Sequence, residues 1–153
     1  MATSIVFDLI DTLVSRFTTA LSDTNVFDGY GITDDPDDYL MVGVEDPDSD
    51  RATSAEGKQV WAGLGARSRD EEGTVTCIAM SWNGDADLSA ARAACKAITV
   101  AVEDHLRADP NLGGDVPGLL WTGYGTRTEL IQLQATDGAC VMCVFDIAFK
   151  ARI

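Results

Sequence analysis

Apolar residues near the start of the chain recur at steps of three and four, which is the spacing of one face of an α-helix. Polar residues such as Asp8 and Asp11 occupy the other side. Thr3 or Ser4 suits the start of this helix, because a side-chain oxygen there can accept a hydrogen bond from a free backbone N–H group. The pattern predicts an amphipathic helix over residues 4–21. Its expected apolar face consists of Ile5, Val6, Leu9, Ile10, Leu13, Val14, Phe17 and Leu21.

A second amphipathic helix is predicted over residues 88–107. Asp87 precedes it and is a residue type that caps helix N-termini. Pro110, followed by Gly113 and Gly114, ends the helix, because proline lacks the N–H group that a helix interior needs. The expected apolar face consists of Leu88, Ala91, Cys95, Ile98, Val102 and Leu106.

Short strands are predicted between the two helices. Residues 39–44 form a run of apolar and β-branched residues that is typical of a strand. The acidic residues 23–38 before it are rich in turn formers, with at most a short strand near Val26 and Phe27. Residues 45–57 are rich in Asp, Ser, Pro and Thr, which indicates an exposed loop.

A central hairpin follows this loop. Residues 58–67 and 74–82 are expected to pair as antiparallel strands. The intervening Asp-Glu-Glu-Gly sequence at residues 70–73 is the expected turn region, since glycine and acidic residues favour turns.

The last third of the chain alternates apolar and polar residues, which predicts a long β-hairpin. A two-residue turn of Asp137 and Gly138 would put the two apolar sets on opposite faces. A three-residue loop that adds Thr136 places Ala135 opposite Ala139 and brings both sets to one face, with Gly138 in the left-handed conformation. We prefer the three-residue loop. The expected inward residues are Ile131, Leu133 and Ala135 on one strand, and Val141, Cys143, Phe145, Ile147 and Phe149 on the other.

The order of these elements predicts the fold class. Tight turns between strands favour an α/β protein of the α+β type, with an antiparallel or mixed sheet and two amphipathic helices packed on one face. The length of 153 residues suits one domain over residues 1–153. No apolar run reaches the roughly 20 residues of a membrane span. The start of the chain lacks a signal-peptide pattern, so we expect folding in a cytoplasm, without membrane contact.

The chain is strongly acidic, with a net charge of −14. Residues 23–56 hold eleven acids and one base, Arg51. This charge argues against direct binding to nucleic acid, because phosphate contacts need clustered Lys and Arg. The acidic segment is either a solvated loop that keeps the protein soluble or a surface that repels another polyanion.

Catalytic and metal-binding patterns are weak. His105 is the single histidine, so a catalytic triad or a His-based metal site lacks partners. We interpret it as a surface or boundary residue. Cys140 and Cys143 have the spacing of a redox or zinc pair, but residues three apart on a strand point to opposite faces. We therefore expect four free thiols that behave as small apolar side chains: Cys77, Cys95, Cys140 and Cys143.

Asp46, Asp48 and Asp50 imitate the start of a calcium-binding loop. The sixth position of such a loop should be glycine and is Arg51, and the twelfth should be Glu and is Gly57. The two Gly-X-Gly sequences in the chain are too short to be nucleotide-binding signatures. The sequence therefore predicts no catalytic, metal or cofactor site and no enzyme.

Four stretches of the sequence carry a resemblance to a known family. They are residues 4–14 (SIVFDLIDTLV), 39–43 (YLMVG, after an Asp-Asp-Pro turn), 61–73 (WAGLGARSRDEEG) and 149–153 (FKARI). In order and spacing they resemble the tail terminator proteins of long-tailed, siphovirus-type bacteriophages of actinobacterial hosts. The stretches are similar to that family's first helix, an early strand, the central hairpin and the closing strand.

The resemblance implies a viral structural protein at the head-tail connection of a bacteriophage. It implies a homo-oligomeric ring, expected to be a hexamer, that caps the tail tube and stops its polymerisation. The ring would join the tube to a head-completion protein of the neck, and DNA would pass through its lumen without specific binding. The implied location is the tail-neck junction of the virion, after assembly in the host cytoplasm.

Two groups of residues are expected to serve such a ring. Asp34, Asp35, Asp37 and Asp38 are candidates to line or approach the lumen, where like charge would keep DNA from binding. The loop over residues 45–57 is a candidate to become ordered against a neighbouring subunit or the tube, since loops of this length are usually functional or disordered. Its charged residues are Glu45, Asp46, Asp48, Asp50, Arg51 and Glu56.

Two alternatives remain open at this point. One is another neck component, such as a head-closure protein. The other, from a different class, is a small cytoplasmic ligand-binding domain with a pocket between helices and sheet. An enzyme ranks third, because its catalysis would depend on carboxylates alone.

Overall fold

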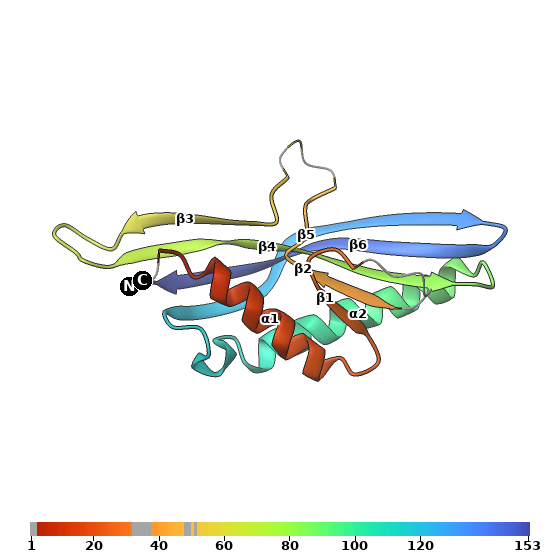
Figure 1. Ribbon diagram of the computed structural model, residues 1–153, viewed down its shortest axis with the longest axis horizontal. Helices are drawn as coiled ribbons and strands as arrows, with labels where there is room; N and C mark the ends of the chain where they lie inside the picture. The colour runs from red at the N-terminus through yellow and green to blue at the C-terminus, as the bar shows by residue number, and fades with distance from the viewer. Residues whose placement is uncertain (1–2, 32–37, 48–49, 51) are drawn as a thin grey trace.

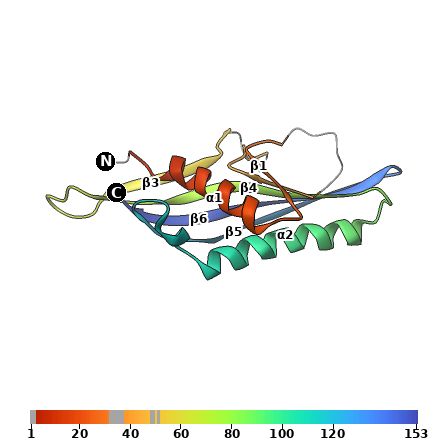
Figure 2. The ribbon, with the colours of Figure 1, turned by 60° about the horizontal axis from the view of Figure 1, so that its bottom comes forward.

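The computed structural model describes residues 3–31, 38–47, 50 and 52–153. Its elements are α1 (Val6–Ala20), β1 (Asn25–Asp28), β2 (Tyr39–Val42), β3 (Ala55–Trp61), β4 (Arg69–Asn83), α2 (Leu88–Ala108), a 3-10 turn (Leu112–Gly114), β5 (Leu119–Ala135) and β6 (Gly138–Arg152). Both helices pack on one face of a six-stranded sheet of order β1-β2-β4-β6-β5, with β3 beside β4 (Figures 1 and 2). The pair β1–β2 is parallel and the other strand pairs are antiparallel. The predicted α+β fold with a mixed sheet is confirmed.

β4 is the central strand of the sheet. It pairs with β6 over fourteen positions, from Asp70 opposite Arg152 to Asn83 opposite Ala139. Along its other edge it pairs with β3 near its start and with β2 near its end. Because successive side chains of a strand point to opposite faces, the odd-numbered residues of β4 and β6 face the helices and the even-numbered ones face away.

The main hydrophobic core lies between the helices and this face of the sheet. α1 buries Leu9, Leu13 and Phe17, as its spacing predicted, while Val6, Ile10 and Val14 are partly buried. Full burial of each large apolar side chain contributes roughly 1.5–3 kcal/mol. α2 buries Ala91, Cys95, Ile98, Val102 and Leu106, and β6 buries Val141, Cys143, Phe145, Ile147, Phe149 and Ala151.

The start of α1 is held by an acid that is distant in sequence. Ile5 occupies the N-cap position, one residue later than predicted, but the Ser4 hydroxyl accepts a hydrogen bond from the Val6 N–H at 3.2 Å, as expected for this residue. The buried Glu71 of β4 accepts hydrogen bonds from the Ile5 N–H at 3.0 Å and from the Ser4 hydroxyl at 2.5 Å. A Cβ atom at Gly57 would lie 2.5 Å from Oε1 of this carboxylate, so the glycine leaves room for it. This contact fixes the first turn of α1 to the sheet.

The start of α2 agrees with the sequence pattern. Asp87 is the N-cap residue, and its carboxylate accepts a hydrogen bond from the Ala90 N–H at 3.1 Å. The other end of the helix is joined to α1 by Arg16. The guanidinium of Arg16 donates to Asp109 at 2.7 Å and to Asp115 at 2.8 Å. The two helices are therefore linked by ion pairs as well as through the core.

The turn of the central hairpin was predicted in the wrong place. β3 ends at Trp61 and β4 begins at Arg69, so the turn covers residues 62–68 and residues 70–73 lie inside β4. Gly73 is required for a different reason, because a Cβ atom there would lie 1.8 Å from a backbone oxygen of β3. A glycine that permits such a close approach cannot be distinguished by sequence from a turn glycine.

The preferred register of the last hairpin is also wrong. Its turn consists of two residues, Thr136 and Asp137, and Ala135 lies opposite Gly138. A Cβ atom at Gly138 would lie 2.3 Å from the ring of Trp82. Gly138 is therefore needed inside the sheet, where an aromatic ring packs over it, and not in the turn.

The inward residues of β5 follow from this register. Leu130 and Gln132, not Ile131 and Leu133, pair with the helix-facing residues of β6. Leu133 is 61% exposed and Ala135 is exposed, so the predicted inward set on this strand is wrong. The inward set predicted for β6 is confirmed.

Replacing Glu71 with Gln tests the contact at the start of α1. The amide keeps the shape of the side chain, and its oxygen can still accept from the Ile5 N–H. Its NH2 group cannot accept from the Ser4 hydroxyl, and the negative charge that strengthens both hydrogen bonds is lost. We expect urea denaturation to show a decrease of about 1–3 kcal/mol in the free energy of unfolding. Glu72→Gln is the matched control, because that side chain is 69% exposed and its Lys150 partner lies 3.6 Å away. Equal effects of both substitutions would contradict a capping role for Glu71.

Candidate assembly surface

The face of the sheet that points away from the two helices is called the open face here. In the described part of the chain both helices lie on the other side of the sheet, and no helix covers this face (Figure 1). One half of it, near the β5–β6 turn, is apolar, and the other half, near the chain ends, is charged.

The apolar half consists of side chains from four strands. Met41, Ile78 and Val144 form a small cluster there that is already buried within the chain, and Ile131 and Met142, which pack against it, remain partly exposed. Exposed Leu133 extends this surface toward the β5–β6 turn. An apolar surface with a polar rim is typical of a site that contacts another protein.

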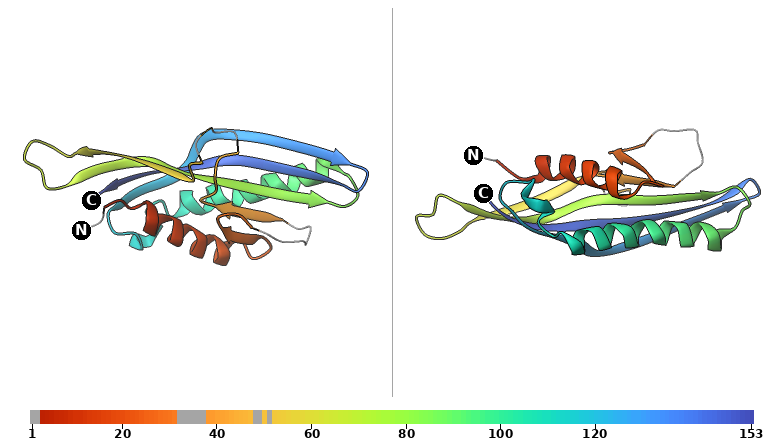
Figure 3. Two further views of the ribbon diagram at one scale, coloured as in Figure 1. Left: turned by 45° about the horizontal axis from the view of Figure 1, so that its top comes forward. Right: turned by 90° about the horizontal axis from the view of Figure 1, so that it is seen from below.

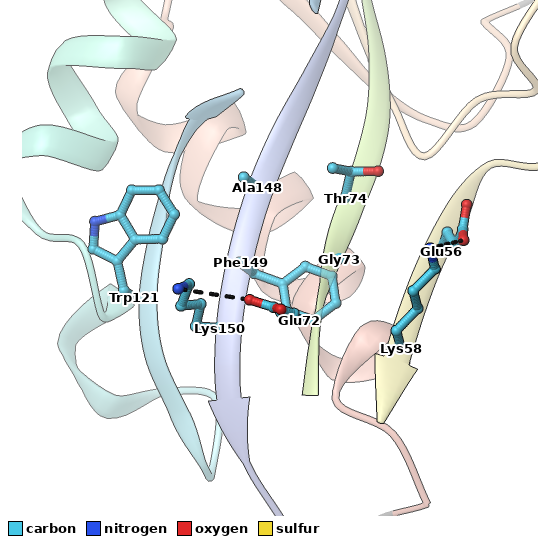
Figure 4. Close-up of a pocket in the computed structure, with 9 residues that line it drawn as sticks. All are labelled: Glu56, Lys58, Glu72, Gly73, Thr74, Trp121, Ala148, Phe149 and Lys150. Carbon is cyan, nitrogen blue, oxygen red and sulfur yellow. Dashed lines mark ion pairs between the residues drawn. The ribbon is translucent and has the colours of Figure 1, made fainter. Parts of the chain in front are cut away.

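The charged half forms a shallow hollow between β3, β4 and β6 (Figure 4). Lys150 lies 3.6 Å from Glu72, and Lys58 lies 3.8 Å from Glu56. Trp121 of β5 stands beside Lys150 (Figure 4). Each carboxylate of the hollow faces a lysine, so this surface presents alternating charges to solvent or to a partner.

Arg127 of β5 fixes part of the predicted assembly loop to the open face. It forms a two-pronged ion pair with Asp46, in which Nη2 lies 2.8 Å from Oδ1, and it also donates to Glu129 at 2.8 Å. The side chains of Arg127 and Asp46 are 23% and 15% exposed, so the pair is well shielded from water. The two carboxylates raise the pKa of Arg127 above its ordinary value.

A bulge in β5 positions Arg127. Three residues, Gly125, Thr126 and Arg127, stand opposite the single residue Asp146 of β6. A Cβ atom at Gly125 would lie 2.7 Å from the Asp146 carbonyl oxygen, so this position needs glycine. The pKa of the Asp146 carboxyl lies above its ordinary value, because burial raises it by more than the charge of Arg127 and the hydrogen bond from Thr76 lower it.

The predicted assembly loop is shorter than expected. β3 begins at Ala55, so Glu56 lies in a strand, and the Ser54 carbonyl accepts a hydrogen bond from the Thr76 N–H at 2.9 Å. Among its other charged residues, Glu45 and Asp50 are exposed, Asp46 is bound by Arg127, and Asp48 and Arg51 lie outside the described residues.

The candidate lumen acids are described in part. Asp34, Asp35 and Asp37 lie outside the described residues. Asp38 is half-buried, and its carboxylate accepts a hydrogen bond from the Ser81 hydroxyl at 2.6 Å. This contact ties the start of β2 to β4, and the role of these acids in a lumen stays a prediction.

The turn between β3 and β4 is a surface that the sequence analysis missed. This hairpin projects from one end of the elongated molecule (Figures 1 and 3). Leu64 at its tip is fully exposed, and Trp61 is 67% exposed with the Arg69 guanidinium 5.8 Å from its ring centre. The sequence does contain a signal for this surface. Residues 57–69 contain three bases and no acid, although the whole chain has 25 acids.

The thiols and the histidine occupy the predicted environments. All four cysteines are free, and Cys140 and Cys143 point to opposite faces of β6. Burial raises the pKa of Cys77 and of Cys95 to about 12, which suppresses thiolate chemistry. His105 sits at a boundary, with its ring edge-on to Phe17 at 5.7 Å.

The described residues form neither a metal-binding cluster nor a membrane-spanning helix. Within the ranges that the structure describes, no group of three or more His, Cys, Asp or Glu side chains is placed to hold a metal ion. Neither helix in these ranges has the length and apolar character of a membrane span.

Comparison with known proteins identifies a shared fold. No family model matches this sequence, and no curated protein sequence matches it. Among solved structures, the chain is similar to one chain of the virion of a native gene transfer agent (GTA) particle, with a TM-score of 0.56 and 14% sequence identity. The match covers 98% of this chain and 100% of that chain. At this identity the likeness shows that the two chains have the same fold over their full lengths.

Replacing Arg127 with Gln tests how the loop is attached. The change leaves Asp46, Glu129 and Asp146 close together without a counter-charge, so we expect a loss of about 2 kcal/mol in the free energy of unfolding. Hydrogen exchange at the Thr76 N–H, which bonds to Ser54, should become faster. Arg92→Gln is the control, because exposed Arg92 pairs with the neutral Gln132. Unchanged exchange in Arg127→Gln would show that the ion pair does not hold the loop.

His105 predicts a pH dependence of stability. Burial, and then the nearby charge of Arg16, lower its pKa below the ordinary value of about 6.5. The stability that the neutral His105 side chain provides is therefore fully present above about pH 6.5. It is lost as the pH falls from this value to the pKa of His105 in the folded protein, because in that interval the unfolded chain takes up a proton and the folded chain does not. His105→Phe keeps a ring against Phe17 and should abolish this part of the decline. Parallel stability curves for both proteins between pH 5 and 7 would contradict it.

Proposed function

We propose that this protein is a non-enzymatic structural component of a phage-like virion, with the role of a tail terminator. The observation that carries the proposal is the fold shared with a chain of the gene transfer agent virion over 98% of this chain and 100% of that one. The likeness extends over both helices and the whole sheet, and not over a single motif.

The surfaces of the molecule support an assembly role. The elongated sheet exposes large apolar side chains toward its two ends, namely Trp61 and Leu64 in the β3–β4 hairpin and Leu133 near the β5–β6 turn. Soluble monomers rarely gather such residues at projecting ends without a partner to cover them. The buried thiols and the boundary histidine do not form a nucleophile-and-base pair in the described part of the chain.

In this proposal the chain forms a homo-oligomeric ring, expected to be hexameric, at the tail-neck junction. The ring caps the tail tube, stops its polymerisation and binds a head-completion protein on its other side. DNA passes through the lumen without specific binding, which a net charge of −14 favours because like charges repel phosphates. Asp34, Asp35, Asp37 and Asp38 are proposed to lie on or near the lumen.

Measuring the mass and shape of the purified protein tests this function. Light scattering should find a species several times the mass of the 16.3 kDa chain, and negative-stain images should show rings, alone or with tail-tube protein added. Tubes polymerised without this chain are the control and should be longer and uncapped. A protein that stays monomeric under both conditions and leaves tube length unchanged would contradict the terminator role. Binding only to a neck protein would favour a head-closure role.

A further inference from the structure

The β3–β4 hairpin ends in an apolar and basic tip. We define the hairpin tip as Val60, Trp61, Leu64 and Arg67, all of which are exposed. Leu64 stands between Gly63 and Gly65, and these two glycines meet no other atoms within 4 Å of a Cβ position. A leucine so placed contributes nothing to the core of its own chain.

The charge of this hairpin is opposite to that of the rest of the molecule. Residues 57–69 contain Lys58, Arg67 and Arg69 and no acid, whereas the whole chain has 25 acids and 11 bases. Two such tips repel each other, so a symmetric tip-to-tip contact is disfavoured. Outside residues 57–69 the chain has 25 acids and eight bases, so the rest of a second copy is acidic on average and attracts the tip.

The opposite end of the molecule has the complementary character. The turns after β4 and after β5 lie there (Figures 1 and 3), and they expose Asp85, Asp87 and Asp137. The open face beside them carries exposed Leu133 and half-buried side chains. We define the acceptor face as Met80, Trp82, Ile131, Leu133 and Met142, with Asp137 at its rim.

We propose that the hairpin tip of one copy docks on the acceptor face of the next copy. Leu64 and Trp61 cover the apolar side chains, and Arg67 pairs with Asp137. The contact joins two different surfaces, so repeated copies associate head to tail and close into a ring if the rotation between them permits. That the copies close into a ring rests on the proposed function. The docking of the hairpin tip on the acceptor face is the contact between neighbouring subunits of that ring.

A nucleic-acid ligand fits the hairpin less well. Asp70 and Glu72 follow the tip directly in β4, and Asp70 already binds Arg152 at 2.7 Å. Phosphate binding depends on clustered bases without nearby acids. The exposed Leu64 and Val60 instead favour an apolar partner surface.

Two substitutions test the contact from its two sides. Leu64→Asp removes the tip, Leu133→Asp removes the acceptor face, and both positions are exposed enough to leave folding intact, which circular dichroism checks. Each variant alone should associate at least about tenfold more weakly than the original chain in sedimentation velocity. Mixed together, they should form a two-chain species and nothing larger, because one intact tip and one intact acceptor face remain. Val100→Asp is the control, because it places the same charge on the exposed side of α2 away from both surfaces.

The outcomes separate this inference from the proposed function. If the original chain forms rings and Leu64→Asp forms them equally well, the docking inference is wrong and the terminator role stands. If the two variants fail to associate when mixed, the tip does not meet the acceptor face, and the inference is again wrong. If the original chain stays monomeric even with tube protein, both proposals fail. DNA binding that is lost in Arg67→Glu while rings persist would assign the hairpin to DNA instead.

Discussion

The pairing of β4 with β6 over fourteen positions is the interaction on which the rest of the structure depends. Because side chains alternate along both strands, this one ladder produces an apolar face that the helices cover and a second face that they leave open. Its length also exceeds the region that the helices cover, so hairpins project at both ends (Figure 2). The core and the two exposed ends therefore have the same origin.

Both helices and the apolar face of β6 could be predicted from the sequence, because long windows with one period leave little ambiguity. The hairpin turns could not be predicted, because in each hairpin a glycine that resembles a turn residue is required inside the sheet instead. Gly73 permits a close approach of two backbones, and Gly138 lies beneath the ring of Trp82. Neither constraint is visible until the neighbouring strand is in place.

The candidate surfaces were harder to predict than the fold. The ion pair of Asp46 with Arg127 joins residues 81 positions apart and depends on the bulge in β5, for which the sequence offers only Gly125 as a signal. The acidic segment at residues 23–56 dominates the charge pattern of the sequence, whereas the basic segment at residues 57–69 is shorter and lies directly after it. The net charge summed over a window as short as one hairpin distinguishes the basic segment from the acidic one.

The bulge in β5 has a further consequence for how the chain behaves in a crowded cell. β5 has 17 residues and, among the strands that the structure describes, one edge without a neighbour. A long straight edge is a template on which strands of other chains can add to form fibrils. The three residues opposite Asp146 break the regular spacing of its free N–H and C=O groups into two shorter runs. An incoming strand that follows one run loses register at the bulge, so growth by strand addition is interrupted in the middle of the edge.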